Sequence, residues 1–488
     1  EFKESYGVDD SWKNMSWYAN IDYNYRNLYF AQVAMSLESS SRFGENADGL
    51  SLGGVKWAYY PSVQLGWAIS NEKWFPKTSA LNYFLLKAGY DITGNDDINN
   101  YAARTSFQVM QYLNNTSVHM LNNIGNDKIT YEKTGQWNVG FKSYLLNNRL
   151  GVDFNYYQKH TTNLLTLKTF ENPVAGINNY WSNGGSMDNQ GFEVTVTTKP
   201  VVSKDFNIEL GASVGHYENK IKTLPNDDKI YVDGVKNAQG YTSSIYGTDN
   251  IATIVGQPVG SFYGYKTAGV FATDAQAKAA GNNDYLYYLD ETGAKQYFKA
   301  GDMHFVDLNK DGKIDEADKT IIGNPNPDIY GNIFGSVMWK NFTLTLGLNY
   351  SLGNDVYNYS RSVLESGTNF YNQTVAMANR WRHEGQVTDM PRLSYGDPMG
   401  NSRFSDRWIE DGSYLRLKTV NISYKVPVKG DWIQGLTIWA EANNLFTITK
   451  YLGSDPEFSA ANGVLYQGID PGNVALSRTF TFGMKINL

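Results

Sequence analysis

Residues 479–488 read Thr-Phe-Thr-Phe-Gly-Met-Lys-Ile-Asn-Leu. Apolar and polar side chains alternate along this stretch, so that Phe480, Phe482, Met484, Ile486 and Leu488 share one face. Because successive side chains of a strand point to opposite faces, this period of two predicts a β-strand with one apolar and one polar face. A long series of such strands, separated by polar loops, is typical of a transmembrane β-barrel that is apolar outside and wet inside.

The same alternation recurs along the chain. We predict strands at residues 14–25, 27–38, 57–69, 81–91, 129–144, 148–161, 186–199, 206–220, 330–339, 342–352, 412–427, 436–447 and 477–488. Around Lys418 the apolar phase slips, which predicts a β-bulge. We expect the apolar face to meet lipid and the polar face to meet the lumen. The expected outward residues are Leu436, Ile438, Phe480, Phe482 and Ile486, and the expected lumen residues are Thr437, Glu441, Lys485 and Asn487.

The connections between these strands alternate in length. Short turns follow Tyr25, Ile69, Leu145, Lys199, Lys340 and Pro427, whereas long loops occupy about 39–56, 92–128, 162–185, 221–329, 353–411 and 448–476. Bacterial barrels place short turns in the periplasm and long loops outside, and they have an even number of strands. Our strand count is odd, which would place residue 1 outside the cell. We therefore expect that the N-terminal part of the barrel is missing from this chain, or that one strand is miscounted.

Composition excludes several classes of protein. The hydrophobic fraction is 41% and the mean hydropathy is -0.45, too polar for a helical membrane protein, and no apolar run reaches the ~20 residues of a spanning helix. Aromatic residues make up 15%, which suits aromatic girdles at the membrane interfaces or loops that stack on sugars. Cys is absent, which excludes disulfides and thiolate metal sites. The net charge of -7 argues against a nucleic-acid partner. The polar start, Glu1-Phe2-Lys3-Glu4, is unlike a signal peptide, so we expect a mature, processed or fragmentary chain.

One local motif has the spacing of a calcium-binding loop. Residues 307–318 place oxygen-bearing or carbonyl ligands at EF-hand positions 1, 3, 5, 7, 9 and 12, with Gly312 at the sharp turn. The predicted ligands are Asp307, Asn309, Asp311, the carbonyl of Lys313, Asp315 directly or through water, and Asp318. Position 12 is Asp where a bidentate Glu is usual, which predicts weaker or one-armed coordination. We expect Ca²⁺ first and Mg²⁺ second, in a role that stiffens the loop; the alternative is a surface turn without metal.

No catalytic constellation stands out. The five His are far apart, and no Gly-x-Ser-x-Gly elbow is present, so we predict no catalytic residues and no enzyme activity. Aromatic residues of the long loops either stack on sugars, contact a partner protein or pack the loops together. These residues are Trp181, Tyr359, Tyr371, Trp381 and Trp408. Trp439 and Glu441 lie on the predicted lumen face, where they line a substrate path.

Residues 406–418 read Asp-Arg-Trp-Ile-Glu-Asp-Gly-Ser-Tyr-Leu-Arg-Leu-Lys. This segment closely resembles the "EDGSYLRLK" strand entry of SusC/RagA-type TonB-dependent transporters, the outer-membrane importers of Bacteroidetes. Other segments resemble family motifs in the same order: Tyr131–Thr134 ("WEKT"), Asn189–Glu193 ("NKGFE"), Gly260–Tyr265 ("GSFYGY"), the Asp307 loop, Asn443–Phe446 and Asp455–Glu457. Together they cover nearly the whole chain.

The resemblance implies an all-β fold, the C-terminal portion of a 22-stranded transmembrane antiparallel barrel whose lumen is plugged. Residues 1–488 then correspond to the barrel portion, and 221–329 to a large extracellular loop region that contains the EF-hand-like loop. The plug domain is expected to be absent from this chain. Leu488 departs from the usual aromatic end of outer-membrane strands.

The resemblance also implies partners and a location. These are a SusD-like surface lipoprotein that lids the barrel, TonB acting through the missing N-terminal part, and the lipid of the bacterial outer membrane. We expect an active importer of a large nutrient, an oligosaccharide in first place, with a lid partner on loops 221–329 and 353–411. The alternatives are a peptide importer, a passive porin-like barrel and a surface interaction or adhesion platform.

Overall fold

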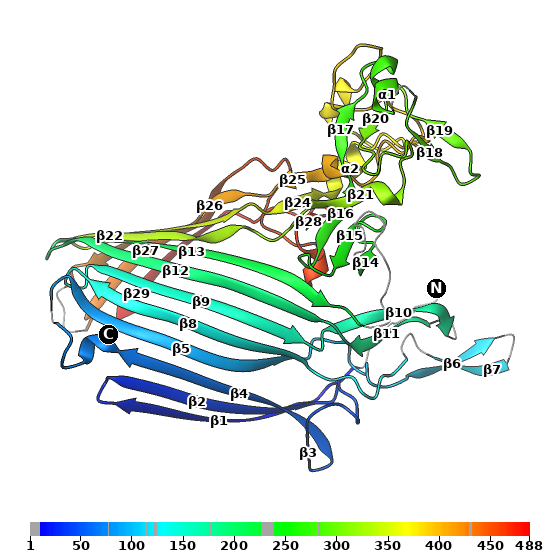
Figure 1. The fold of residues 1–488 in the computed structure, drawn as a ribbon. Coiled ribbons are helices and arrows are strands. Elements are labelled where there is room, and N and C mark those ends of the chain that lie inside the picture. Colours follow the sequence, from blue (N-terminus) through cyan, green and yellow to red (C-terminus); the bar gives the residue numbers. More distant parts are fainter. Residues whose placement is uncertain are drawn as a thin grey trace, which may run out of the picture. The chain divides into compact units, whose positions relative to one another are not determined.

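The computed structural model describes residues 10–76, 78–112, 115–120, 124–174, 177–225, 239–281, 284–428 and 432–488. The chain divides into two compact units. Unit 1 comprises Glu1–Val194 and Ile221–Asp227, and unit 2 comprises Thr195–Lys220 and Asp228–Leu488. Both are built on long strands (Figure 1). Within the described residues, no helix is long and apolar enough to cross a membrane.

Unit 1 is a sheet of long strands in the order β1-β2-β4-β5-β8-β9-β12. These strands are β1 (Asn14–Tyr25), β2 (Tyr29–Ser40), β4 (Val55–Ala68), β5 (Leu81–Asn95), β8 (Glu132–Leu145), β9 (Leu150–Thr162) and β12 (Ser186–Val202). Its loops carry β3 (Leu50–Leu52), the 3-10 helix η1 (Ile69–Asn71) and two hairpins, β6 (Phe107–Tyr112) with β7 (Asn115–Met120) and β10 (Leu165–Val174) with β11 (Ile177–Asn183). In the described residues β1 has β2 as its strand partner and forms an edge of the sheet.

The boundary between the units falls inside β12, after Val194. The strands of unit 2 follow in the order β12-β13-β22-β23-β26-β27-β29. Its long strands are β13 (Phe206–Thr223), β22 (Ile329–Trp339), β23 (Phe342–Leu352), β26 (Tyr414–Val426), β27 (Gly435–Thr449) and β29 (Thr479–Asn487). β29 pairs with β27 and is an edge strand among the described residues. Every strand predicted from the alternation is confirmed, with ends that differ by a few residues. β5, for example, continues to Asn95, which still pairs with Glu132.

The strand registers put apolar side chains in continuous rows. In unit 2 one row runs through Phe482, Ala440, Ile422, Leu344, Val337 and Ile208. The neighbouring row on the opposite face runs through Thr481, Glu441, Asn421, Thr345, Ser336 and Glu209. Directly paired residues share a face, so the sheet has one apolar and one polar surface. The registers confirm that Leu436, Ile438 and Ile486 share the apolar face.

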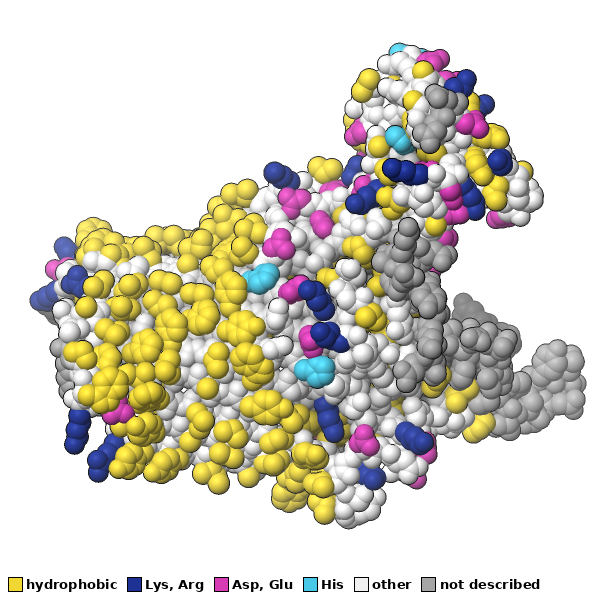
Figure 2. Space-filling model, in the orientation of Figure 1, with side chains coloured by type: hydrophobic (Ala, Val, Ile, Leu, Met, Phe, Trp, Pro, Cys, Tyr) yellow, Lys and Arg dark blue, Asp and Glu magenta, His cyan; other side chains and the backbone are white. Residues whose placement is uncertain are grey.

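Unit 1 follows the same rule. One apolar row runs through Tyr23, Ala31, Leu65, Ala88, Val139 and Tyr156. In Figure 2 hydrophobic side chains gather in a broad band over the long strands, and charged side chains lie at its margins. A band of this kind is the surface that a barrel presents to lipid.

The predicted irregularity at Lys418 is a β-bulge. The ladder between β26 and β27 shifts between Leu417 and Thr419, and the ladder between β23 and β26 shifts between Gly347 and Leu348. Two residues upstream, Arg416 is buried and pairs with two carboxylates of the loop that follows β27, Asp455 and Glu457 (Nη1 to Oε2, 2.7 Å). This ion pair ties β26 to that loop.

The long loops of unit 2 contain secondary structure that the sequence did not predict. Its elements are β14 (Gly240–Ser243), β15 (Ile251–Ile254), β16 (Ser261–Tyr265), β17 (Thr267–Val270), α1 (Asp274–Ala280), β18 (Tyr287–Leu289), β19 (Lys295–Tyr297), β20 (Met303–Phe305), η2 (Glu316–Asp318), β21 (Lys319–Gly323), β24 (Asp355–Asn358), α2 (Tyr359–Leu364), η3 (Val375–Asn379), η4 (Asp406–Trp408), β25 (Ile409–Asp411), η5 (Val464–Tyr466) and β28 (Ile469–Asp470). These strands are too short for alternation to reveal them.

Apolar clusters, including the following two, hold these loop elements together. The first includes Phe271, Phe298, Met303 and Phe305, all nearly inaccessible to solvent. The second includes Phe262, Tyr357, Trp408 and Ile469. Loops with cores of their own have a fixed conformation, which a binding site requires. Within the predicted loop 221–329, residues 226–238 and 282–283 lie outside the described residues.

Candidate functional site

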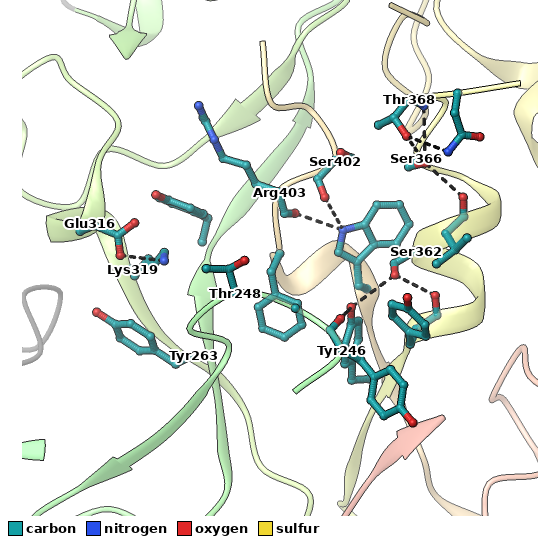
Figure 3. Close-up of a pocket in the computed structure, with 18 residues that line it drawn as sticks. Tyr246, Thr248, Tyr263, Glu316, Lys319, Ser362, Ser366, Thr368, Ser402 and Arg403 are labelled. Carbon is teal, nitrogen blue, oxygen red and sulfur yellow. Dashed lines mark hydrogen bonds and ion pairs between the residues drawn. The ribbon is translucent and has the colours of Figure 1, made fainter. Parts of the chain in front are cut away.

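A pocket of about 510 Å³ opens between the loop elements of unit 2 (Figure 3). Aromatic and hydroxyl-bearing side chains dominate its lining. The lining residues are Tyr246, Gly247, Thr248, Tyr263, Tyr265, Glu316, Lys319, Tyr357, Tyr359, Ser362, Val363, Ser366, Thr368, Asn369, Ser402, Arg403, Phe404 and Trp408.

One wall of the pocket is the short strand β16. It pairs with β21, so that Tyr263 lies opposite Ile321 and Tyr265 opposite Lys319. Because side chains alternate along a strand, Tyr263 and Tyr265 point the same way, into the pocket, while Phe262 points into the core and is inaccessible to solvent. The motif at 260–265 thus supplies both a core anchor and part of the lining.

The opposite wall is the start of helix α2. Asn358 caps it, with Oδ1 accepting a hydrogen bond from the backbone N–H of Arg361 at 2.9 Å. Arg361 then forms ion pairs with Glu365 (2.9 Å) and Glu410 (3.0 Å), which hold the helix against β25. This arrangement fixes Tyr359 and Ser362 at the pocket.

Trp408 joins the two walls. Its indole is buried, and Nε1 donates to the carbonyl oxygen of Arg403 at 3.1 Å. The carbonyl of Phe404 in turn accepts from the backbone N–H of Tyr265 at 3.2 Å. The 402–408 segment is therefore held to both β16 and the apolar core.

Two tyrosines of the pocket have raised pKa values. Burial raises the pKa of Tyr357 to about 12 and raises the pKa of Tyr265 as well. Tyr357 donates to the carbonyl oxygen of Tyr246 at 2.9 Å, and the rings of Tyr246 and Tyr359 lie 4.9 Å apart. Such rings offer faces for stacking and hydroxyls for hydrogen bonds.

Three charged side chains line the pocket. Lys319 pairs with Glu316 at 2.7 Å, as Figure 3 shows. Arg403 contributes the third charge. Aromatic faces, hydroxyls and charges of this kind are the groups that bind a polar ligand.

The EF-hand-like loop 307–318 lies close to this pocket in sequence and is fully described. Asp307 accepts hydrogen bonds from the backbone N–H groups of Lys310 (Oδ1, 2.6 Å) and Gly312 (Oδ2, 2.7 Å). Gly312 has φ of 83°, which a glycine adopts without strain. Asp311 accepts from the N–H of Lys313 at 2.8 Å. The chain thus turns back on itself as the motif predicts.

The end of this loop is held by its own hydrogen bonds. Asp318 is buried and accepts from the N–H groups of Leu308 (2.8 Å) and Asp315 (2.9 Å), and burial raises its pKa. Lys313 Nζ lies 2.6 Å from Asp315 Oδ2. Among the described residues, no group of three or more His, Cys, Asp or Glu side chains is placed to hold a metal. The donor set is all oxygen, as Ca²⁺ requires, but its carboxylates bond to backbone groups in this arrangement.

The structure brings two of the predicted contact residues, Tyr359 and Trp408, into the pocket. The others lie elsewhere. Trp381 packs on Gly301, and its Nε1 donates to the carbonyl of Ala272 at 3.3 Å. Tyr371 is exposed on its loop. Trp181 packs against a buried cluster of unit 1.

Two further predicted residues, Trp439 and Glu441, lie on the polar face of β27. Glu441 accepts hydrogen bonds from the side-chain amides of Asn421 and Asn443, both at 3.0 Å. The sequence analysis missed Tyr246, Tyr357, Lys319 and Arg403 as pocket residues. No local pattern marks them, because the pocket forms only when separate loops fold together.

No protein-family model matches the chain. Curated relatives do match nearly all of it. TonB-dependent receptor P3 of Formosa agariphila is 27% identical over 492 residues, which is 97% of this chain and 45% of the relative. TonB-dependent receptor SusC of Bacteroides thetaiotaomicron is 28% identical over 496 residues, 97% of this chain and 43% of the relative. The chain therefore spans about half the length of the curated relatives it matches.

Solved structures agree with these relatives. The structure of the RagAB peptide transporter superimposes with a TM-score of 0.76 at 22% identity, covering 97% of this chain and 48% of that chain. The RagAB peptide importer in its open-open state gives a TM-score of 0.74 at 22% identity and covers 98% of this chain. The resemblance to SusC/RagA-type transporters is confirmed. The fold is that of a transmembrane antiparallel β-barrel, and its location is the bacterial outer membrane.

Proposed function

We propose that this outer-membrane chain, similar to TonB-dependent receptors of the SusC/RagA type, is the barrel portion of an active importer of a large nutrient. The ligand proposed first is an oligosaccharide. The observation that carries this choice is the loop pocket, where tyrosine rings and the hydroxyls of residues such as Ser362 and Thr368 converge. Sugar rings pair apolar faces with many hydroxyls, and this lining offers the complement of both.

The uptake of a labelled oligosaccharide tests the proposal. Cells that carry the intact protein are compared with and without a protonophore, which collapses the proton gradient that TonB uses. We expect uptake to stop with the protonophore. Uptake that continues unchanged would favour a passive porin-like barrel.

A peptide importer is the second candidate, because the chain superimposes with a TM-score of 0.76 on the structure of the RagAB peptide transporter. The same cells, given labelled peptides in place of oligosaccharides, separate the two. Import of peptides alone would assign the peptide role.

We infer a protein partner at the loop 353–411. Its apolar side chains Phe370, Val375 and Val387 are each about 90% exposed. Large exposed apolar side chains grouped on one loop are typical of an interaction surface. A SusD-like lipoprotein acting as a lid is the proposed partner, and TonB is proposed to act through a plug domain outside this chain. Co-purification tests this proposal. We expect such a lipoprotein to co-purify with the intact protein, and to be lost when Phe370 and Val375 are both replaced by Ser. If the protein serves only in adhesion, no lipoprotein co-purifies.

We also propose that the 307–318 loop binds Ca²⁺, with Mg²⁺ as a weaker alternative. Binding would redirect the carboxylates of Asp307, Asp311 and Asp318 from backbone groups to the ion. The ion would stiffen a loop next to the pocket, since Glu316 of this loop lines it. Isothermal titration of the intact, chelator-treated protein with CaCl₂ tests it.

A further inference from the structure

Arg403 is a charged side chain of the pocket without a close countercharge. Among the described residues no carboxylate oxygen lies within the 4.0 Å of an ion pair with its guanidinium. Its Nη1 is buried and has no hydrogen-bond partner. An arginine stays protonated in proteins, and a buried charge is costly unless it is paired. The second cation of the pocket, Lys319, is already neutralised by Glu316 at 2.7 Å.

Two carboxylates near Arg403, those of Asp397 and Glu316, bond to other groups. Asp397 accepts hydrogen bonds from the N–H of Asn401 (2.8 Å), the N–H of Ser402 (2.8 Å) and the hydroxyl of Ser402 (2.6 Å). Glu316 is committed to Lys319. Burial, the largest influence, lowers the pKa of Arg403. Asp397 and Glu316 attract the guanidinium from a distance, but neither forms an ion pair with it.

Aromatic rings surround the guanidinium instead. Its carbon lies 4.5 Å from the ring centroid of Tyr288, 5.4 Å from that of Phe305, 5.7 Å from that of Phe298 and 5.9 Å from that of Tyr265. Rings contact the faces of a planar guanidinium and hold it in place, whereas its N–H groups point outward in the plane. The group is therefore held rigid with hydrogen-bond donors to spare. In Figure 3 the side chain extends from Ser402 toward the side of the pocket where Glu316 and Lys319 lie.

The charges that line the pocket leave one positive charge in excess, from Arg403. A fixed guanidinium fork with free donors matches the two oxygens of a carboxylate or of a sulfate group. We propose that the pocket recognises an oxyanion carried on a sugar, with Arg403 bonding to the oxyanion and the tyrosine rings contacting the sugar ring. This inference rests on the proposed oligosaccharide import and narrows it to acidic oligosaccharides. Hydroxyl and ring groups such as Ser362 and Tyr359 favour a saccharide over an acidic peptide.

The test uses the purified intact protein in detergent and isothermal titration with matched probes. One pair is trigalacturonic acid and its methyl ester, and the other is a galactan oligosaccharide with and without sulfate esters. We expect at least one acidic probe to bind tenfold or more tightly than its neutral partner, and this advantage to shrink as NaCl rises. The two pairs separate a carboxylate ligand from a sulfate ligand. Equal affinity within both pairs would overturn the inference, and this comparison needs no variant.

Variants then assign the effect to Arg403. In Arg403→Met we expect the preference for the acidic probe to disappear while binding of the neutral probe persists, and in Arg403→Lys we expect part of the preference to return. Arg382→Met is the matched control, since Arg382 is an exposed arginine of the same loop region whose Nη2 bonds to the carbonyl of Ala378 at 3.0 Å. A preference that survives in Arg403→Met contradicts the assignment.

The outcomes also separate this inference from the proposed function. If neutral and acidic oligosaccharides bind with equal affinity, the proposal of oligosaccharide import still holds, but the proposal that Arg403 recognises an oxyanion is wrong. An acidic peptide that binds in an Arg403-dependent way, when no saccharide does, overturns the sugar ligand. Failure of every probe to bind overturns both.

Discussion

Arg392 donates two parallel hydrogen bonds to Asp302, from Nε to Oδ1 at 2.8 Å and from Nη2 to Oδ2 at 3.0 Å. Asp302 is inaccessible to solvent, and it also accepts from the backbone N–H of Lys299 (2.9 Å) and the side-chain amide of Asn401 (3.1 Å). A bidentate pair of this kind is both strong and specific in geometry. It joins two loop segments that lie about ninety residues apart and that both lead into the pocket region.

Removal of one partner should loosen this junction. In Arg392→Ala the Asp302 carboxylate stays buried with fewer partners, and we expect the loop region to lose about 2–4 kcal/mol of local stability. Hydrogen exchange of the intact protein measures it, as faster exchange of the backbone N–H groups of Met303 and Trp381. Arg382→Ala, an exposed arginine nearby, should leave these rates unchanged. Equal exchange in both variants would show that the pair contributes nothing.

The two faces of the sheet should respond differently to charge. Ile422 lies on the apolar face and is 51% exposed, whereas its neighbour Ser423 lies on the polar face. We expect Ile422→Arg to cost about 2–4 kcal/mol, because an arginine there meets lipid, and Ser423→Arg to cost little. Urea titration of the intact protein folded into lipid vesicles gives both values. A larger cost at Ser423 would mean that the faces are reversed.

The hairpin of β18 and β19 should loosen in acid. Hydrogen bonds from the Thr292 hydroxyl and the Gln296 amide lower the pKa of Asp290 to about 2. A lowered pKa means that the carboxylate stabilises the fold above its ordinary pKa of about 4, and that this stabilisation is lost as the pH falls toward 2. NMR or exchange signals of the Thr292 and Ala294 N–H groups, which bond to Asp290 at 2.9 Å, should report it.

Asp290→Asn is the control for that titration. The amide cannot ionise, so the variant should show no pH dependence between pH 4 and about 2 at the same two N–H groups. A titration that persists in the variant would assign the effect to another acid.

The EF-hand-like loop gives a fourth prediction. Asp311→Ala removes a central oxygen ligand, and we expect at least a tenfold loss of Ca²⁺ affinity in calorimetry of the intact protein, about 1.4 kcal/mol. Asp205→Ala, on an exposed short turn of the same chain, should bind Ca²⁺ normally. If neither the original protein nor the two variants release heat with CaCl₂, the segment is a turn held by its own hydrogen bonds.

The long strands could be predicted from the sequence because alternation is a local property. Each of Phe480, Phe482 and Ile486 reveals its face through its nearest neighbours alone. The turn at 307–318 is equally local, since its pattern lies within twelve consecutive residues. The bulge at Lys418 left a visible slip in the same alternation.

The pocket could not be predicted in this way. Tyr246, Tyr357 and Arg403 come from three separate segments, and their meeting depends on packing around Trp408 and the loop cores. The residues around Arg403 in the sequence do not distinguish it from a surface arginine. Its missing countercharge becomes visible only when the positions of Asp397, Glu316 and Lys319 are known.

The buried ion pair of Arg416 has a mechanical consequence. Arg416 lies on a barrel strand, and its partners Asp455 and Glu457 lie on the loop that follows β27. If this loop moved away from the strand, the buried guanidinium of Arg416 would lose its two carboxylate partners. Such a movement is therefore costly. We therefore expect the 450–478 segment to keep its place on the strand when loop segments without such an ion pair move.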